Sequence, residues 1–191
     1  MSVAKLAARG LIGGLMFGHG MQKLQGWFGG PGLEGTDGMM QALNMYPPRR
    51  NSVVAGAVEA GGGAALVLGL GTPLVSSALI GQMIVAIRKV HLPNGPWAAN
   101  GGWEYNAVLI AALALLAEQG PGPISLDAAM GMEKKGVGWG LGAVALGAAA
   151  SVAAVELGRR SAPATAPTSA ASQDGTGSPF PDTAGDPVTD E

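Results

Sequence analysis

The sequence predicts an all-α integral membrane protein built as a bundle of transmembrane helices. Hydrophobic residues make up 48% of the 191-residue chain and charged residues only 13%, whereas soluble domains carry about 25% charged residues. The apolar residues gather in runs, several of them close to the roughly 20 residues that a helix needs to cross a bilayer. Most of the 33 glycines lie inside these runs, where small residues let helices approach closely.

The apolar runs predict five transmembrane segments. We expect them at about residues 6–24, 52–71, 73–90, 103–119 and 137–157. Lys5 and Arg9 precede the first run as in a signal peptide, but no small-residue cleavage motif follows it, so we expect an uncleaved helix. The second and third runs are separated only by a Gly-Thr-Pro link, which predicts an antiparallel hairpin.

These segments divide the chain into three parts: a four-helix core at residues 1–132, an additional transmembrane helix at 133–160, and a tail at 161–191. Inside the core, residues 25–51 are too polar to span a bilayer and are expected to form a lid, with Asp37 capping a short amphipathic helix. The tail is rich in Ser, Thr, Ala, Pro, Gly and Asp and is expected to be disordered.

Composition excludes several classes of function. The net charge of −2 and the absence of a long basic cluster give no footprint for nucleic acid. The chain has no cysteine, which excludes disulfides, thiolate chemistry and cysteine-bound metal clusters. We therefore predict no metal site, and any redox role would need a bound cofactor or a partner protein.

Alternating helix directions bring the polar residues of four helix ends to the same side of the membrane, while the opposite half is expected to be almost purely apolar. The candidate binding residues are His19, Lys23, Glu59, Gln82, Arg88, His91 and Glu104. Glu59 is the strongest of them, because an ionisable residue at the centre of a transmembrane helix costs about 2.5 to 3.5 kcal/mol and is expected to face the bundle interior.

Each of these residues also has a purely structural interpretation. Glu59 could pair with Lys23 or Arg88 only to fix the helix register, and His19 could be hydrogen-bonded to a neighbouring helix. For His91 an interfacial position is favoured over a ligand contact, and the helix dipole alone explains Glu104. No catalytic residue is assigned.

Two ligands are considered for this polar cluster. Two histidines at similar depth could bind a haem, but no other haem signature is present, so haem ranks low. A small amphipathic ligand such as a quinone fits better, with its head among His19, Glu59 and Arg88 and its tail in the lipid bilayer.

Pairs of small residues four positions apart recur in the sequence. They are Gly10 with Gly14, Gly14 with Gly18, and Gly138 with Gly142. Such pairs favour close packing within one bundle over a homo-oligomer interface, which is the alternative.

Four motifs carry a resemblance to a known family. They are GHGMQKLQGWFGGPG, VEAGGGAALVLGLGTPL, AIRKVHLPNGPW and GGWEYNAVLIAALALLAEQGPGPISLD. The chain resembles the DoxX family over about residues 3–132, and the last motif is the most specific. The resemblance implies a four-helix bundle in the bacterial inner membrane, associated with quinone-linked respiration, sulfur oxidation or defence against oxidative stress. By position it adds Ser125 and Asp127 to the matched polar residues.

The resemblance favours a redox-associated membrane protein that binds a ligand or acts as a subunit of a quinone-linked oxidoreductase. One alternative is a scaffold that recruits soluble oxidant-defence enzymes, and another is a conductor of protons or small solutes. The fifth span and the acidic tail depart from the family pattern, and the Lys and Arg residues near the helix ends leave both membrane orientations open.

Overall fold

The computed structural model describes residues 3–164, in which all regular structure is helical. The α-helices are α1 (Val3–Gln25), α2 (Gly32–Ala42), α3 (Pro48–Leu68), α4 (Thr72–Ala86), α5 (Glu104–Gln119), α6 (Leu126–Ala129) and α7 (Val137–Arg160). The 3-10 turns are η1 (Trp27–Gly29), η3 (Leu92–Asn94) and η4 (Ala98–Asn100), and η2 (Ile87–His91) is a π-helical turn. The all-α prediction is thus confirmed for these residues, and the predicted tail lies outside them from residue 165 onward.

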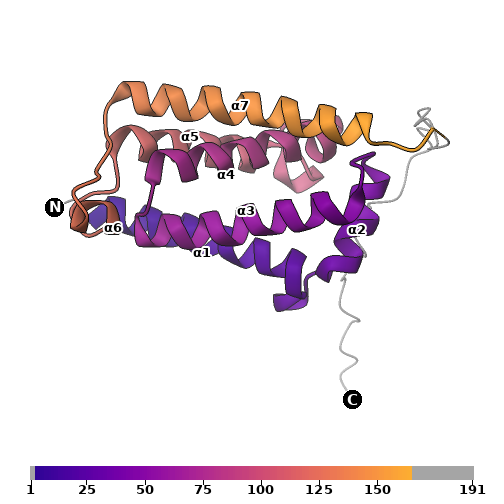
Figure 1. Ribbon diagram of the computed structural model, residues 1–191, viewed down its shortest axis with the longest axis horizontal. Coiled ribbons are helices and arrows are strands. Elements are labelled where there is room, and N and C mark those ends of the chain that lie inside the picture. Colours follow the sequence, from indigo (N-terminus) through magenta and orange to yellow (C-terminus); the bar gives the residue numbers. More distant parts are fainter. Residues whose placement is uncertain (1–2, 165–191) are drawn as a thin grey trace, which may run out of the picture.

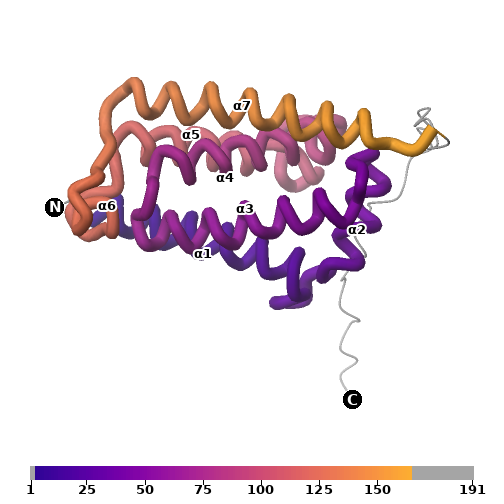
Figure 2. Tube along the Cα trace, viewed as in Figure 1, coloured from indigo at the N-terminus to yellow at the C-terminus, as the bar shows by residue number. Residues whose placement is uncertain are grey.

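Five long helices run side by side in alternating directions (Figure 1). α1 packs against α3, while α4 packs against α5 and α7, and the contact between α3 and α4 joins the two groups. α2 crosses one end of the bundle and α6 lies at the other end (Figure 2). The fully buried side chains of Leu66, Leu79, Ile80 and Leu113 form the core between the groups.

Within residues 3–164, three stretches are long and apolar enough to cross a membrane: Pro48–Leu68, Thr72–Asn94 and Val137–Arg160. α5 has 16 residues and is about 24 Å long, which is shorter than the roughly 30 Å hydrocarbon layer. α1 is longer but carries Lys5, Arg9 and Lys23. All five predicted helices exist close to their predicted positions. Three of them are in stretches that are long and apolar enough to count as membrane spans.

The first helix of the predicted lid does not begin where we expected. Asp37 was expected to cap it, but α2 begins at Gly32, and Asp37 lies inside the helix. There its carboxylate oxygen lies 3.0 Å from Nε of Arg49, an ion pair that joins α2 to the start of α3. Asp37 thus holds α2 against the start of α3 and does not cap the N-terminus of α2.

α1 and α3 approach each other so closely that glycine is required at their contact. A Cβ atom added to Gly20 would lie 2.2 Å from the backbone nitrogen of Ala60. One added to Gly63 would lie 2.3 Å from the backbone nitrogen of Phe17. Neither helix backbone can accept such a contact, so these glycines fix the distance and register of the two helices.

The small-residue pairs singled out in the sequence do not serve this packing. A Cβ atom added to Gly10, Gly14, Gly138 or Gly142 would meet no atom within 4 Å. For these four glycines the expectation of packing inside one bundle is therefore wrong, because they are exposed, whereas a Cβ atom added to Gly18 would lie 3.9 Å from a ring carbon of Phe28. The spacing of small residues alone could not distinguish Gly10 and Gly14 from the buried Gly13 and Gly20, which also lie in α1.

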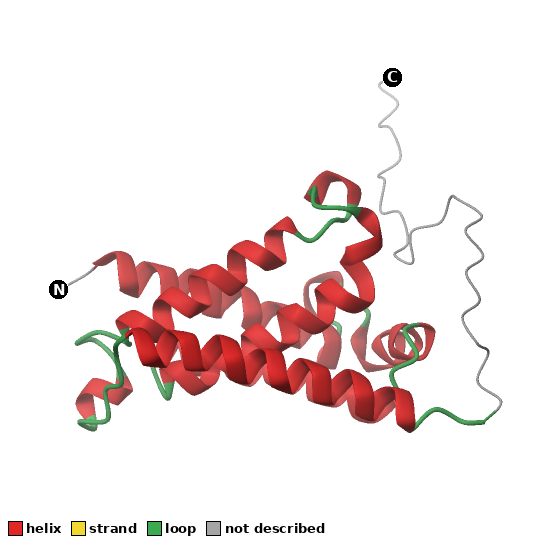
Figure 3. Cartoon of the chain, turned by 90° about the horizontal axis from the view of Figure 1, so that it is seen from above, coloured by secondary structure: helices red, strands yellow, loops and turns green. Residues whose placement is uncertain are grey.

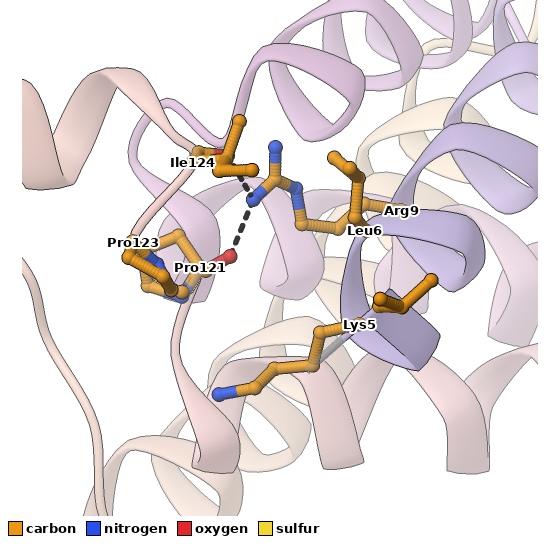
Figure 4. A pocket seen from close by; sticks show the side chains of 8 residues that line it. Lys5, Leu6, Arg9, Pro121, Pro123 and Ile124 are labelled. Carbon is orange, nitrogen blue, oxygen red and sulfur yellow. Dashed lines mark hydrogen bonds between the residues drawn. The ribbon is translucent and has the colours of Figure 1, made fainter. Parts of the chain in front are cut away.

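The opposite half of the bundle is not purely apolar, because it holds the buried guanidinium of Arg9, which is 2% exposed. The guanidinium donates hydrogen bonds to main-chain oxygens of Leu66 (3.1 Å), Val67 (2.8 Å), Ile124 (3.0 Å) and Pro121. Figure 4 shows Arg9 reaching from α1 to Pro121 and Ile124. Arg9 thus joins α1, the end of α3 and the loop after α5.

Asp127 completes this network. Its carboxylate accepts the main-chain N–H groups of Gly71 (2.8 Å) and Thr72 (3.1 Å) at the start of α4. Ser125 caps α6 by accepting the N–H of Ala128 at 3.1 Å. The loops at this end of the bundle (Figure 3) are therefore held by side chains from α1 and α6, which gives Ser125 and Asp127 structural roles.

Gly20→Ala should destabilise the protein by about 1 to 3 kcal/mol, because the added methyl group must push α1 and α3 apart. Thermal unfolding in detergent would measure this effect. Gly14→Ala is the matched control, since its Cβ atom enters open space. Equal melting temperatures for the two variants would contradict the close contact.

Arg9→Leu should lower the free energy of unfolding by about 1 to 3 kcal/mol or more, because the buried main-chain oxygens lose their hydrogen-bond donor. Arg88→Leu removes an exposed arginine and should have little effect in the same thermal unfolding assay. A stable Arg9→Leu variant would show that the network is dispensable.

Candidate functional site

A cavity of about 420 Å³ lies at the end of the bundle that α2 covers. Its polar lining consists of His19, Gln22, Lys23, Glu59, Gln82, Lys89 and His91. Its apolar side chains are those of Pro31, Met39, Met40, Leu43, Met45, Val85, Ala86 and Val90, and Gly29 and Gly30 complete the lining. The polar groups come from α1, α3, α4 and η2, while α2 and the chain that follows it supply most of the apolar wall.

Glu59 lies at the centre of the polar wall and is 3% exposed. One carboxylate oxygen lies 2.5 Å from the ammonium nitrogen of Lys23. The other accepts a hydrogen bond from the side-chain amide of Gln82 at 3.3 Å. Helices α1, α3 and α4 therefore meet at one buried carboxylate, whose charge is compensated by Lys23.

The direction of the helices explains why Lys23 reaches Glu59. The side chains of a helix lean toward its own N-terminus, and α1 and α3 run antiparallel. Lys23 therefore leans back along α1 while Glu59 leans toward the cavity end of α3. The contact of Gly20 with Gly56 and Ala60 brings the two helices close enough for the ion pair to form.

Both histidines line the cavity, and each is held by a local hydrogen bond. Nδ1 of His19 lies 3.0 Å from the side-chain oxygen of Gln22. Nδ1 of His91 lies 2.7 Å from the main-chain oxygen of Gly101, just before α5. The cavity thus brings together five of the seven predicted residues: His19, Lys23, Glu59, Gln82 and His91.

The other two predicted residues lie elsewhere. Arg88 is exposed and does not line the cavity. Glu104 lies at the start of α5, where its carboxylate accepts the main-chain N–H of Ala98 at 2.6 Å. Glu104 therefore orders the loop before α5, and placing these two residues in the cavity was wrong.

Lys89 lines the cavity in place of Arg88, and the sequence contained a signal for it. Lys89 follows Gln82 by seven positions, which is about two helical turns, so the two residues share a face. Val85 and Ala86 lie between them on that face and also line the cavity. Helical spacing from Gln82 would have selected Lys89, whereas charge alone suggested Arg88.

The π-helical turn η2 accounts for the position of His91. At about 100° per residue, a regular α-helix would place a residue nine positions after Gln82 about half a turn away from it. A π turn includes an extra residue, which rotates His91 back toward the face of Gln82. Sequence pattern gave no indication of this turn.

Breaking the ion pair should have unequal effects on its two members. Lys23→Met leaves a buried carboxylate unpaired and should destabilise the protein by about 3 to 5 kcal/mol. Glu59→Leu should cost less, because Lys23 is 20% exposed and its ammonium can turn toward solvent. The double variant should be more stable than the sum of the two single changes predicts. Additive melting-temperature changes in detergent would contradict the coupling.

Comparison with known proteins identifies the first half of the bundle. The family model described as DoxX matches residues 4–92. This range runs from α1 to η2 and contains every polar residue that lines the cavity. It ends before the motif around α5 on which the resemblance depended most. Neither the curated proteins nor the solved structures that were searched gave a match. The match identifies a DoxX domain at residues 4–92, and the apolar helices indicate a membrane protein.

Proposed function

We propose that the protein binds a small amphipathic ligand of the quinone class, with the ligand's head group in the cavity that α2 covers. The observation that carries this proposal is that Lys23 and Gln82 pair with the buried carboxylate of Glu59 in a cavity that also has an apolar wall. A head group with polar oxygens and an apolar ring matches both walls.

The size of the cavity supports a ligand of this class. Small-molecule sites have volumes of about 300 to 1,000 Å³ and combine an apolar lining with a few convergent polar groups. The cavity of about 420 Å³ lies within this range and is large enough for one aromatic head group. The isoprenoid tail of a quinone would extend from it toward lipid.

The charge of the cavity also favours binding over a purely structural pairing. An ion pair that only fixed helix register would gain nothing from an adjoining cavity. Here Lys89 and two histidines join Lys23 and Glu59 around the same space. The cavity therefore offers several hydrogen-bonding groups beyond those that Glu59 occupies.

We assign the protein to the bacterial inner membrane and to a redox-associated process, on the strength of the family resemblance. The chain contains no cysteine, so electrons would pass through a bound quinone and partner redox proteins. In this role it is a subunit or ligand-binding partner. The division into a core at 1–132, a further helix at 133–160 and a tail at 161–191 is retained as part of this proposal.

Proton or solute conduction has less support. A conductor needs polar groups along the whole membrane path. Between the cavity and the Arg9 network lie the apolar side chains of Met16, Leu66, Leu79 and Leu113, each at most 4% exposed. The scaffold alternative would use the loops and the tail, and the tail lies outside the described residues from residue 165 onward. The cavity therefore favours ligand binding.

A cavity-filling variant provides the test. Ala86 lines the cavity, so Ala86→Phe should weaken binding of a short-chain ubiquinone by about tenfold or more, which is about 1.4 kcal/mol. Binding can be measured by native mass spectrometry of the purified protein in detergent.

Ala111→Phe is the matched control, because Ala111 lies on the exposed surface of α5. It should bind the ubiquinone as the unmodified protein does. Absence of saturable binding to the unmodified protein, or equal binding to both variants, would count against the proposed function.

A further inference from the structure

The hydrogen bond between His91 and Gly101 fixes the position of a proton on the imidazole ring. A main-chain carbonyl oxygen can only accept a hydrogen bond. Nδ1 of His91 lies 2.7 Å from the carbonyl oxygen of Gly101, so Nδ1 carries the hydrogen. In the neutral ring Nε2 then has a free lone pair and acts as an acceptor.

This nitrogen lies on the edge of the ring opposite the hydrogen bond to Gly101. His91 lines the cavity, whereas Gly101 does not. The Nδ1 edge therefore points toward the loop before α5, and the opposite edge, with Nε2, is the one available to a ligand.

Several other polar groups of the cavity do not offer a free acceptor with a fixed position. The ammonium groups of Lys23 and Lys89 can only donate hydrogen bonds. Both carboxylate oxygens of Glu59 already accept from Lys23 and Gln82. His19 pairs with Gln22, whose side-chain amide can both donate and accept, so its tautomer is not fixed. Gln82 donates to Glu59 through its amide nitrogen, so its side-chain oxygen is one acceptor that the fold defines. Nε2 of His91 is the other.

We propose that the cavity prefers a head group that carries a ring hydroxyl, the reduced quinol form, with Nε2 of His91 accepting the hydroxyl hydrogen. This inference rests on the proposed function. A quinol hydroxyl can donate to His91 and accept from an ammonium group such as that of Lys89. A quinone carbonyl can only accept and leaves Nε2 without a partner.

The test compares three forms of one head group: 2-methyl-1,4-naphthohydroquinone under anaerobic conditions, its quinone, and its dimethyl ether. The hydroquinone should bind the purified full-length protein about five- to tenfold more tightly than the dimethyl ether, as expected for one hydrogen bond. His91→Phe should remove this preference while the ether binds as before.

Asn94→Ala is the matched control. The side-chain amide of Asn94 also donates to the oxygen of Gly101, at 3.2 Å, but Asn94 does not line the cavity. This variant disturbs the same loop and should keep the preference for the hydroquinone. In His91→Phe, Asn94 remains to hold the loop.

Nitrogen-15 NMR of labelled histidine in the unmodified protein gives a second readout that needs no variant. His91 should show a protonated Nδ1 and an unprotonated Nε2 whose signal shifts when the hydroquinone is added. Equal affinity for hydroquinone and ether, or a protonated Nε2 in the neutral ring, would overturn the inference alone. Failure of all three compounds to bind would instead overturn the proposed function.

Discussion

The close approach of α1 and α3 is the constraint on which the rest of the structure depends. Glycine at positions 20 and 63 lets the two backbones touch, and this contact sets the register in which Lys23 meets Glu59. Gln82 then binds the same carboxylate from α4. The buried charge therefore follows from helix packing, because an unpaired carboxylate could not remain ionised in the interior.

Buried polar side chains have different hydrogen-bond partners at the two ends of the bundle. At the cavity end, charged and polar side chains pair with one another around open space. At the opposite end, Arg9 and Asp127 bind main-chain groups of turns and helix ends, and almost no space remains. The Arg9 and Asp127 contacts are therefore structural, whereas the polar groups around the cavity border open space and are available to a ligand.

Long apolar runs and turn residues were sufficient to predict the helices, since length and hydropathy depend on local sequence alone. The inward orientation of Glu59 was also predictable, because a charged side chain in the middle of an apolar helix is costly to expose to lipid. Helical spacing from Gln82 would have selected Lys89 over Arg88, whereas the rotation of His91 toward the cavity depends on a π turn that no pattern indicates. The role of Arg9 was missed because its acceptors are main-chain oxygens, which any sequence contains.

Arg9 also imposes an order on the biosynthesis of the protein. Its main-chain acceptors at Leu66 and Ile124 lie 57 and 115 residues further along the chain. When α1 leaves the ribosome, none of them has been made. The guanidinium of Arg9 can therefore reach its full set of acceptors only after α5 and the following loop have been translated.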